Sequence, residues 1–294
     1  MTFSPSAHPH TSISLPTVQS LSVNPILFTQ VPALDTVITK LTSFIDTTPS
    51  WPSSPQDQIQ LKELLGRTII PYLKARFPNT KQGQKAPASS ASISSAVLDR
   101  WARSTETFTA ALSVSELFPL VDMWRLAILD PSVGTFISQI PAGNDSRDPL
   151  LVFLDHGIAA LKTSSPNPRN FILTLLRLLS NAFSCAPLAR RVAEEWRALL
   201  TPFLIATLLH DDPTVRTSAA SFAFNVAAFF QNRRVETVRK GLGVEDGPAE
   251  DGEWEVEMVS AVVEAIGREK ESEDVGESVL ECNSVLSLLL RSFP

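Results

Sequence analysis

The chain has 294 residues, of which 44% are hydrophobic and 19% charged, so it can bury a sizeable core and is not globally disordered. Its net charge of −6 argues against a nucleic-acid partner, because nucleic-acid binders usually present a net basic face. The longest apolar runs span 12 residues, whereas a bilayer-spanning helix needs about 20, so they predict buried helices and no membrane partner.

The start of the chain and its thiols predict a cytoplasmic or nuclear protein. Residues 1–12, MTFSPSAHPHTS, lack the basic and apolar regions of a secretory signal. Two cysteines, Cys185 and Cys282, fit a reducing compartment, and a single disulfide between them is the alternative interpretation.

The first 95 residues show three kinds of pattern. Residues 1–20 are rich in Ser, Thr, Pro and His, which predicts a flexible tail. Residues 21–76 form a helical segment, with apolar residues at helical spacing from 25 to 48 and again from 59 to 76. Residues 77–95, rich in Ser, Pro and Gly, predict a linker.

From residue 96 to 294 the pattern is almost entirely helical, and no strand pattern persists between turn signals. Short loops between many helices are typical of helical pairs or triplets stacked side by side. An acidic, Gly-containing stretch at 243–253 predicts a solvated loop. The predicted helices are 96–112, 116–129, 132–139, 148–162, 168–184, 186–196, 198–209, 213–230, 232–240, 254–268 and 274–292.

The segment 210–230, HDDPTVRTSAASFAFNVAAFF, indicates how these helices are arranged. Asp212 can cap a helix that starts at Pro213, and the alanines that follow let neighbouring helices approach closely. The segment resembles the third helix of an armadillo repeat. Because no clean period of about 40 residues is found, we expect an all-α, armadillo-like helical stack with degenerate repeats.

Three segments together resemble the PUL domain, a module named after a phospholipase-activating protein and its yeast ubiquitin-pathway relatives. FPLVDMWRLAILDPSVGTF (118–136) is similar to the family signature FP-x-LD-x-LRL…P.V. LLRLLSNAF (175–183) matches its LR-x-x-x-N-x-F helix, and SAASFAFNVA (218–227) occupies the place of its ALATLxLNxS helix. By contrast, residues 284–294 are a poor match to the family's C-terminal helices, which puts those helices in doubt.

The resemblance implies a protein-interaction adaptor. Such modules bind the short, acidic, aromatic C-terminal tail of the AAA+ ubiquitin-selective segregase in a basic groove, and they act in ubiquitin-dependent, proteasomal protein turnover. Other ubiquitin-pathway proteins are further expected partners. Residues 97–131 also look like fungal proteins that join a PUL domain to thioredoxin and papain-like peptidase domains, so the alternatives are the non-catalytic part of such a fusion or a generic peptide-binding scaffold.

Polar stripes on three of the predicted helices are the candidate peptide-binding residues. Extended peptides must regain the hydrogen bonds that their amides lose to water. Asparagine offers both a donor and an acceptor, and arginine offers a fork for carboxylates. The candidates are Asp122, Arg125, Thr174, Arg177, Asn181, Ser221 and Asn225, with Thr217 on the third stripe.

The sequence also fits structural roles for the same residues. Asp122 and Arg125 could pair with each other, and Asn181 and Asn225 could tie adjacent helices together. A second basic set is expected on a solvated surface: Arg190, Arg191, Arg216, Arg233, Arg234, Arg239 and Lys240.

No catalytic motif is visible, so we predict no enzyme activity, no cofactor and no metal site. The chain has no G-x-S-x-G, no P-loop and no metal-spaced cluster. Cys185 is expected to be a buried structural thiol. A dyad of Cys185 with His156 or His210 is the most specific catalytic hypothesis that remains.

Overall fold

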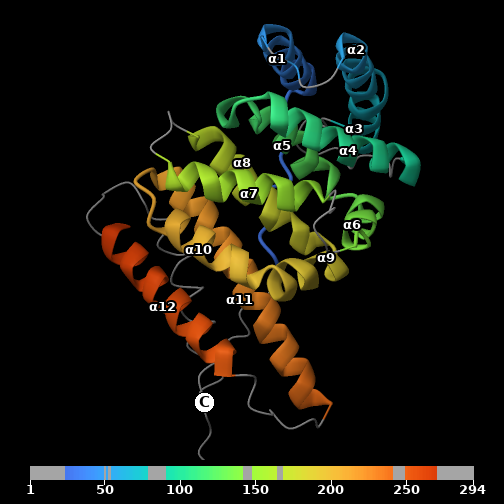
Figure 1. The fold of residues 1–294 in the computed structure, drawn as a ribbon. Helices are drawn as coiled ribbons and strands as arrows, with labels where there is room; N and C mark the ends of the chain where they lie inside the picture. Colours follow the sequence, from blue (N-terminus) through green and yellow to red (C-terminus); the bar gives the residue numbers. More distant parts are fainter. Residues whose placement is uncertain are drawn as a thin grey trace, which may run out of the picture.

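The computed structural model describes residues 24–49, 51, 54–78, 91–141, 148–163, 168–240 and 249–269. Every regular element in these ranges is a helix, which confirms the predicted all-α helical stack, whereas its armadillo-like geometry stays a prediction (Figure 1). None of the described helices has the length and hydropathy to cross a membrane.

Twelve α-helices, two π-helical turns and two 3₁₀ turns build the described part of the chain. The π-helical turns are Leu65–Ile69 and Arg191–Glu195, and the 3₁₀ turns are Val114–Glu116 and Ala182–Ser184. The helices are α1 (Leu34–Thr47), α2 (Pro55–Leu64), α3 (Ile70–Arg76), α4 (Ser95–Ala111), α5 (Phe118–Ala127), α6 (Pro131–Ser138), α7 (Pro149–Lys162), α8 (Arg169–Asn181), α9 (Ala186–Arg190), α10 (Arg197–Leu208), α11 (Pro213–Arg239) and α12 (Ala249–Glu269).

Asp-Pro pairs start three of these helices. In each pair the proline takes the first helical position, where no N–H is needed, and the aspartate accepts a hydrogen bond from the next free backbone N–H. Asp130 accepts from the N–H of Ser132, Asp148 from that of Leu150, and Asp212 from that of Thr214, at 2.9–3.0 Å. This recurring start signal explains why the predicted starts of these three helices agree closely with the structure.

Helices α5, α8 and α11 lie side by side in the middle of the stack. At the start of α8, Arg169 pairs with Asp212 just before α11, so these two helices run parallel and in register. Behind α5, the Trp124 and Trp101 rings stack at 3.8 Å, and Trp124 Nε1 donates a hydrogen bond to Thr105. The stacked rings therefore tie α5 to α4.

Two predicted boundaries differ from the structure. The helices predicted at 213–230 and 232–240 are one helix, α11, because neither glycine nor proline interrupts the sequence between them. Helix α12 begins at Ala249, inside the predicted acidic loop 243–253, because alanine and the several glutamates of this stretch have high helix propensity. The predicted tail, most of the predicted linker and the predicted helix 274–292 lie outside the described residues.

A buried ion pair links α7 to the turn after α9. Asp148 Oδ2 lies 3.4 Å from Arg191 Nη2, and both side chains are almost fully buried. Arg191 also donates a hydrogen bond to the carbonyl of Ile137 at 2.8 Å. Burial raises the pKa of Asp148 to about 6, although Arg191 and the backbone N–H of Leu150 oppose the shift.

We expect Asp148→Asn to remove a distinct pH dependence of stability. The pKa of Asp148 in the folded chain, about 6, exceeds the ordinary 3.8, so the folded chain binds the carboxyl proton more tightly than the unfolded chain does. Protonation of Asp148 therefore stabilises the folded state in acid, and this stabilisation is lost as pH rises through 6. Asparagine keeps the cap but does not titrate. The unfolding free energy of wild type minus that of the variant should therefore fall by about 2–3 kcal/mol between pH 4 and 7.

Urea denaturation of both proteins at a series of pH values measures this difference. A difference that grows with pH would mean that attraction to Arg191 outweighs burial of the Asp148 carboxylate.

Candidate peptide-binding groove

The predicted polar stripes on α5, α8 and α11 meet on one surface of the stack. Asn181 Nδ2 donates a hydrogen bond to the carbonyl of Arg125 at 2.9 Å, so α8 is tied to α5. Asn225 Nδ2 donates in the same way to the carbonyl of Ser180 at 3.2 Å, which ties α11 to α8. Both asparagines are buried. Asn181 and Asn225 therefore tie adjacent helices together, which is the structural role that the sequence left open for them.

The same two asparagines also bind an extended segment of the chain itself, residues 24–33, which we call the strap. Ile26 donates its N–H to Asn225 Oδ1 at 2.7 Å and accepts from Asn225 Nδ2 at 2.9 Å. Phe28 makes the same pair of bonds with Asn181, at 2.7 and 3.0 Å. The helical pattern predicted from residue 25 is therefore wrong for the strap, and helix α1 begins only at Leu34.

Arg125 completes this series of contacts on α5. Its guanidinium donates to the Phe28 carbonyl at 2.5 Å, to the Gln30 carbonyl at 3.0 Å and to Asp122 at 2.5 Å. Strap residues 26, 28 and 30 are thus bound through their backbones by α11, α8 and α5 in turn. The blue segment that precedes α1 in Figure 1 crosses the stack in this way.

Residues one and two helical turns before these contacts share the helix faces that hold the strap, because residues three, four, seven and eight apart lie on one face of a helix. We call this row the lane, and Arg177 is its central residue. The lane residues are Phe118 and Asp122 on α5, Thr174 and Arg177 on α8, and Thr217 and Ser221 on α11.

Most polar groups of the lane are satisfied within the protein. Asp122 pairs with Arg125, Thr174 donates to the carbonyl of Asn170, and buried Ser221 donates to the carbonyl of Thr217. Asp212, at the start of α11, pairs with Arg169. The lane therefore offers little free negative charge.

Arg177 differs from these groups. Its guanidinium lies 5.3 Å from the centre of the Phe28 ring, and its Nε is buried without a hydrogen bond. Within the described ranges no carboxylate is paired with it. Burial lowers the pKa of Arg177, and the neighbouring Arg125 lowers it further, while the Asp122 carboxylate opposes the shift. A half-buried cation with an unused donor is suited to bind an anion from outside the described structure.

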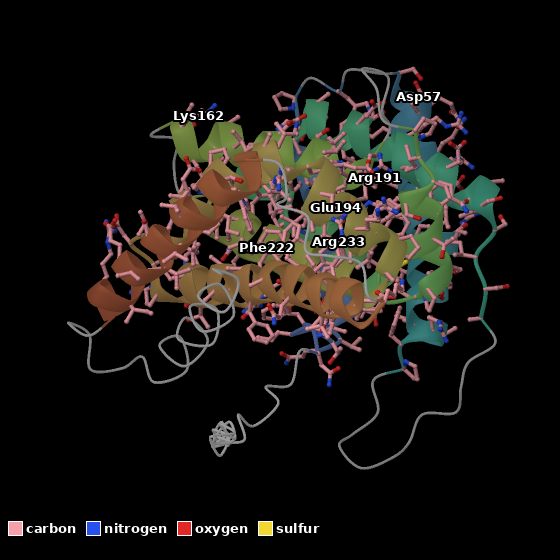
Figure 2. The ribbon with its side chains drawn as sticks, turned by 90° about the horizontal axis from the view of Figure 1, so that it is seen from below. Asp57, Lys162, Arg191, Glu194, Phe222 and Arg233 are labelled. Carbon is pink, nitrogen blue, oxygen red and sulfur yellow. The ribbon has the colours of Figure 1, made fainter. Side chains whose placement is uncertain are left out.

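The second basic set is only partly solvated. Arg191 and Arg216 are buried, so the prediction of a solvated surface is wrong for both. Arg216 donates to the backbone carbonyls of His210 and Asp211, each at 2.8 Å, which fixes the turn before α11. Exposed Arg233 pairs with Glu194, which also binds Arg190 (Figure 2).

The residues of the catalytic hypothesis occupy structural positions. Cys185 is buried, and its side chain lies directly against Gly134. His210 Nδ1 accepts a hydrogen bond from the N–H of Asp212, and burial lowers the pKa of His156. Among the described residues no cluster of three metal-binding side chains occurs.

Comparison with known proteins agrees with this architecture. The PUL domain family matches residues 23–280, a range that includes the strap, the three central helices and the lane. No curated protein matches the chain significantly. The chain therefore belongs to the PUL domain family, whose members are protein-interaction modules linked to the ubiquitin and AAA ATPase pathway.

Proposed function

We propose that the lane binds the acidic C-terminal tail of the AAA+ ubiquitin-selective segregase, and that the chain acts as an adaptor in ubiquitin-dependent protein turnover in the cytoplasm or nucleus. The observation that carries the proposal is Arg177, a half-buried cation with an unused Nε beside the strap. The strap already occupies Asn181, Asn225 and Arg125, so an incoming peptide would lie next to it.

A carboxylate of the tail would supply what Arg177 lacks. It would lie against the accessible part of the half-buried Arg177 guanidinium and offset the repulsion between Arg177 and Arg125. A charge-assisted hydrogen bond of this kind contributes about 1.5–3 kcal/mol. Thr174, half-exposed one turn earlier on α8, offers a hydroxyl to the same peptide.

Titration of a fluorescein-labelled tail peptide against the intact protein tests this proposal. We expect saturable binding that weakens steadily as salt is raised, because the lane is open to solvent and its charges are screened. A peptide of the same composition in scrambled order is the control for non-specific charge attraction. Absence of saturable binding at low salt, or equal binding of both peptides, would contradict the proposal.

A further inference from the structure

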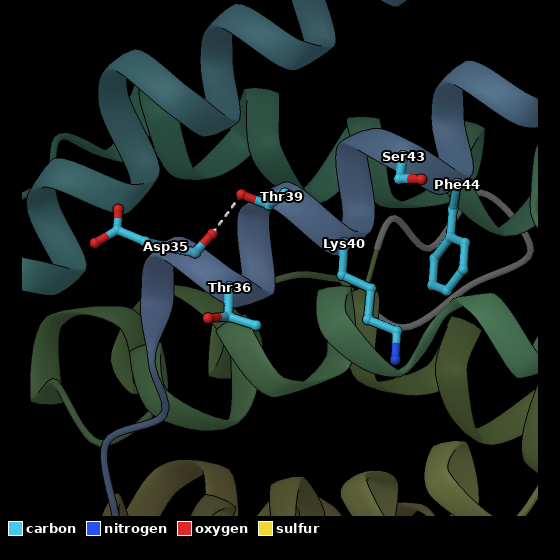
Figure 3. A pocket seen from close by; sticks show the side chains of 6 residues that line it. All are labelled: Asp35, Thr36, Thr39, Lys40, Ser43 and Phe44. Atoms are coloured by element: carbon cyan, nitrogen blue, oxygen red, sulfur yellow. Dashed lines mark hydrogen bonds between the residues drawn. The ribbon is translucent and has the colours of Figure 1, made fainter.

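An open hollow of about 500 Å³ lies on α1, the helix that follows the strap (Figure 3). Its residues present one ammonium group, one carboxylate, one aromatic ring and several hydroxyls. They are Asp35, Thr36, Thr39, Lys40, Ser43 and Phe44.

Lys40 is the cation of this hollow. Its Nζ lies 4.7 Å from the centre of the Phe118 ring and 5.9 Å from that of Phe44. The two rings meet edge to face at 6.4 Å, so they form an apolar floor under the ammonium group. No carboxylate in the described part of the chain pairs with Lys40. Asp35, the carboxylate that lines the hollow, pairs with Lys74 at 2.5 Å.

The hollow adjoins the lane through Phe118. On α5, Phe118, Asp122 and Arg125 are four and three residues apart, so they share the face that the strap crosses. Lys40 on α1 covers the Phe118 end of this face. A peptide that follows the lane from Arg177 past Asp122 would therefore reach Lys40 next.

We propose that this hollow is a second anion subsite of the lane, which takes a carboxylate of the same acidic peptide on Lys40. The aliphatic part of that acidic side chain would lie against the Phe44 ring, and the hydroxyl of Thr36, one turn before Lys40 on the same helix face, would face its oxygens. This inference rests on the proposed function, and it adds that α1 takes part in recognition.

Lys40→Glu should weaken binding of the labelled tail peptide about tenfold, and Lys40→Met about threefold, because an exposed ion pair contributes only modestly. Lys162→Glu, the same charge change on exposed Lys162 at the end of α7, is the matched control and should bind like wild type. Melting temperatures identify a variant that fails to fold. Lys40→Met keeps most of the aliphatic side chain that covers the Phe44 and Phe118 rings. If Lys40→Glu melts at a lower temperature than wild type, the binding of Lys40→Met is compared with wild type instead.

A set of peptides, each with one acidic residue changed to its amide, identifies the carboxylate. For one peptide of the set, the amide substitution should lower the affinity for wild type. The same substitution should not lower the affinity for Lys40→Glu. Affinity of both Lys40 variants equal to that of wild type, while Arg177→Glu still weakens binding, would overturn the subsite alone. Absence of tail binding by wild type would overturn the proposed function, and this subsite with it.

Discussion

Asn181→Ala is expected to destabilise the fold by about 2–5 kcal/mol, because each buried partner left without a hydrogen bond costs about 1–3 kcal/mol. Asn181 is fully buried, and its carboxamide makes three hydrogen bonds, two to Phe28 of the strap and one to the Arg125 carbonyl. Alanine would leave the N–H of Phe28 and the carbonyl of Arg125 without these partners. The Phe28 carbonyl keeps its bond to Arg125, which limits the loss.

Urea denaturation measures this effect, with Asn170→Ala as the matched control. Asn170 is an exposed asparagine on the same helix, so its replacement should change the unfolding free energy by less than about 0.5 kcal/mol. Equal stability of the two variants would mean that the strap is not held on the stack by Asn181.

Arg177→Glu is expected to weaken binding of the acidic tail peptide about 100-fold, since it removes a charge-assisted bond and adds repulsion. It should leave the fold largely intact, because Arg177 makes no ion pair within the described ranges and contacts the strap only through the Phe28 ring. Arg67→Glu, on the highly exposed Arg67, is the control for the change in net charge. Unchanged affinity in a folded Arg177→Glu protein would place the tail elsewhere.

Local signals in the sequence predicted most of the fold. Helix starts at Asp130, Asp148 and Asp212 follow from an acidic cap and a proline, which act within a few residues. The pairing of Arg125 with Asp122 within α5, one of the open alternatives, also follows from their spacing of three residues. These features depend on neighbours in sequence, so the sequence alone could predict them.

The strap could not be predicted in the same way. Its apolar residues fall at spacings that also suit a helix, and the groups that hold it extended come from far away in the chain. The bond between Ile26 and Asn225 spans 199 residues, and no local pattern signals it. Pro25 and Pro32 near its two ends were the available indication that helix α1 starts later.

The strap also changes the interpretation of the candidate site. Arg125, Asn181 and Asn225 bind extended backbone, as the sequence suggested for such side chains, but that backbone belongs to the chain itself. Recognition of a partner by the seven candidate residues stays a prediction. Of these residues, Arg177 is the one whose guanidinium makes no ion pair within the described ranges.

A charge-swap titration tests the central claim, that Arg177 of the lane recognises a carboxylate of an acidic peptide. Wild type and Arg177→Glu are each titrated with the tail peptide and with a set of peptides in which one acidic residue is changed to lysine. We expect one lysine peptide to bind Arg177→Glu about tenfold more tightly than the unchanged peptide does, while wild type shows the opposite preference. If every lysine substitution has the same effect on both proteins, Arg177 does not contact the peptide and the lane is not its binding site.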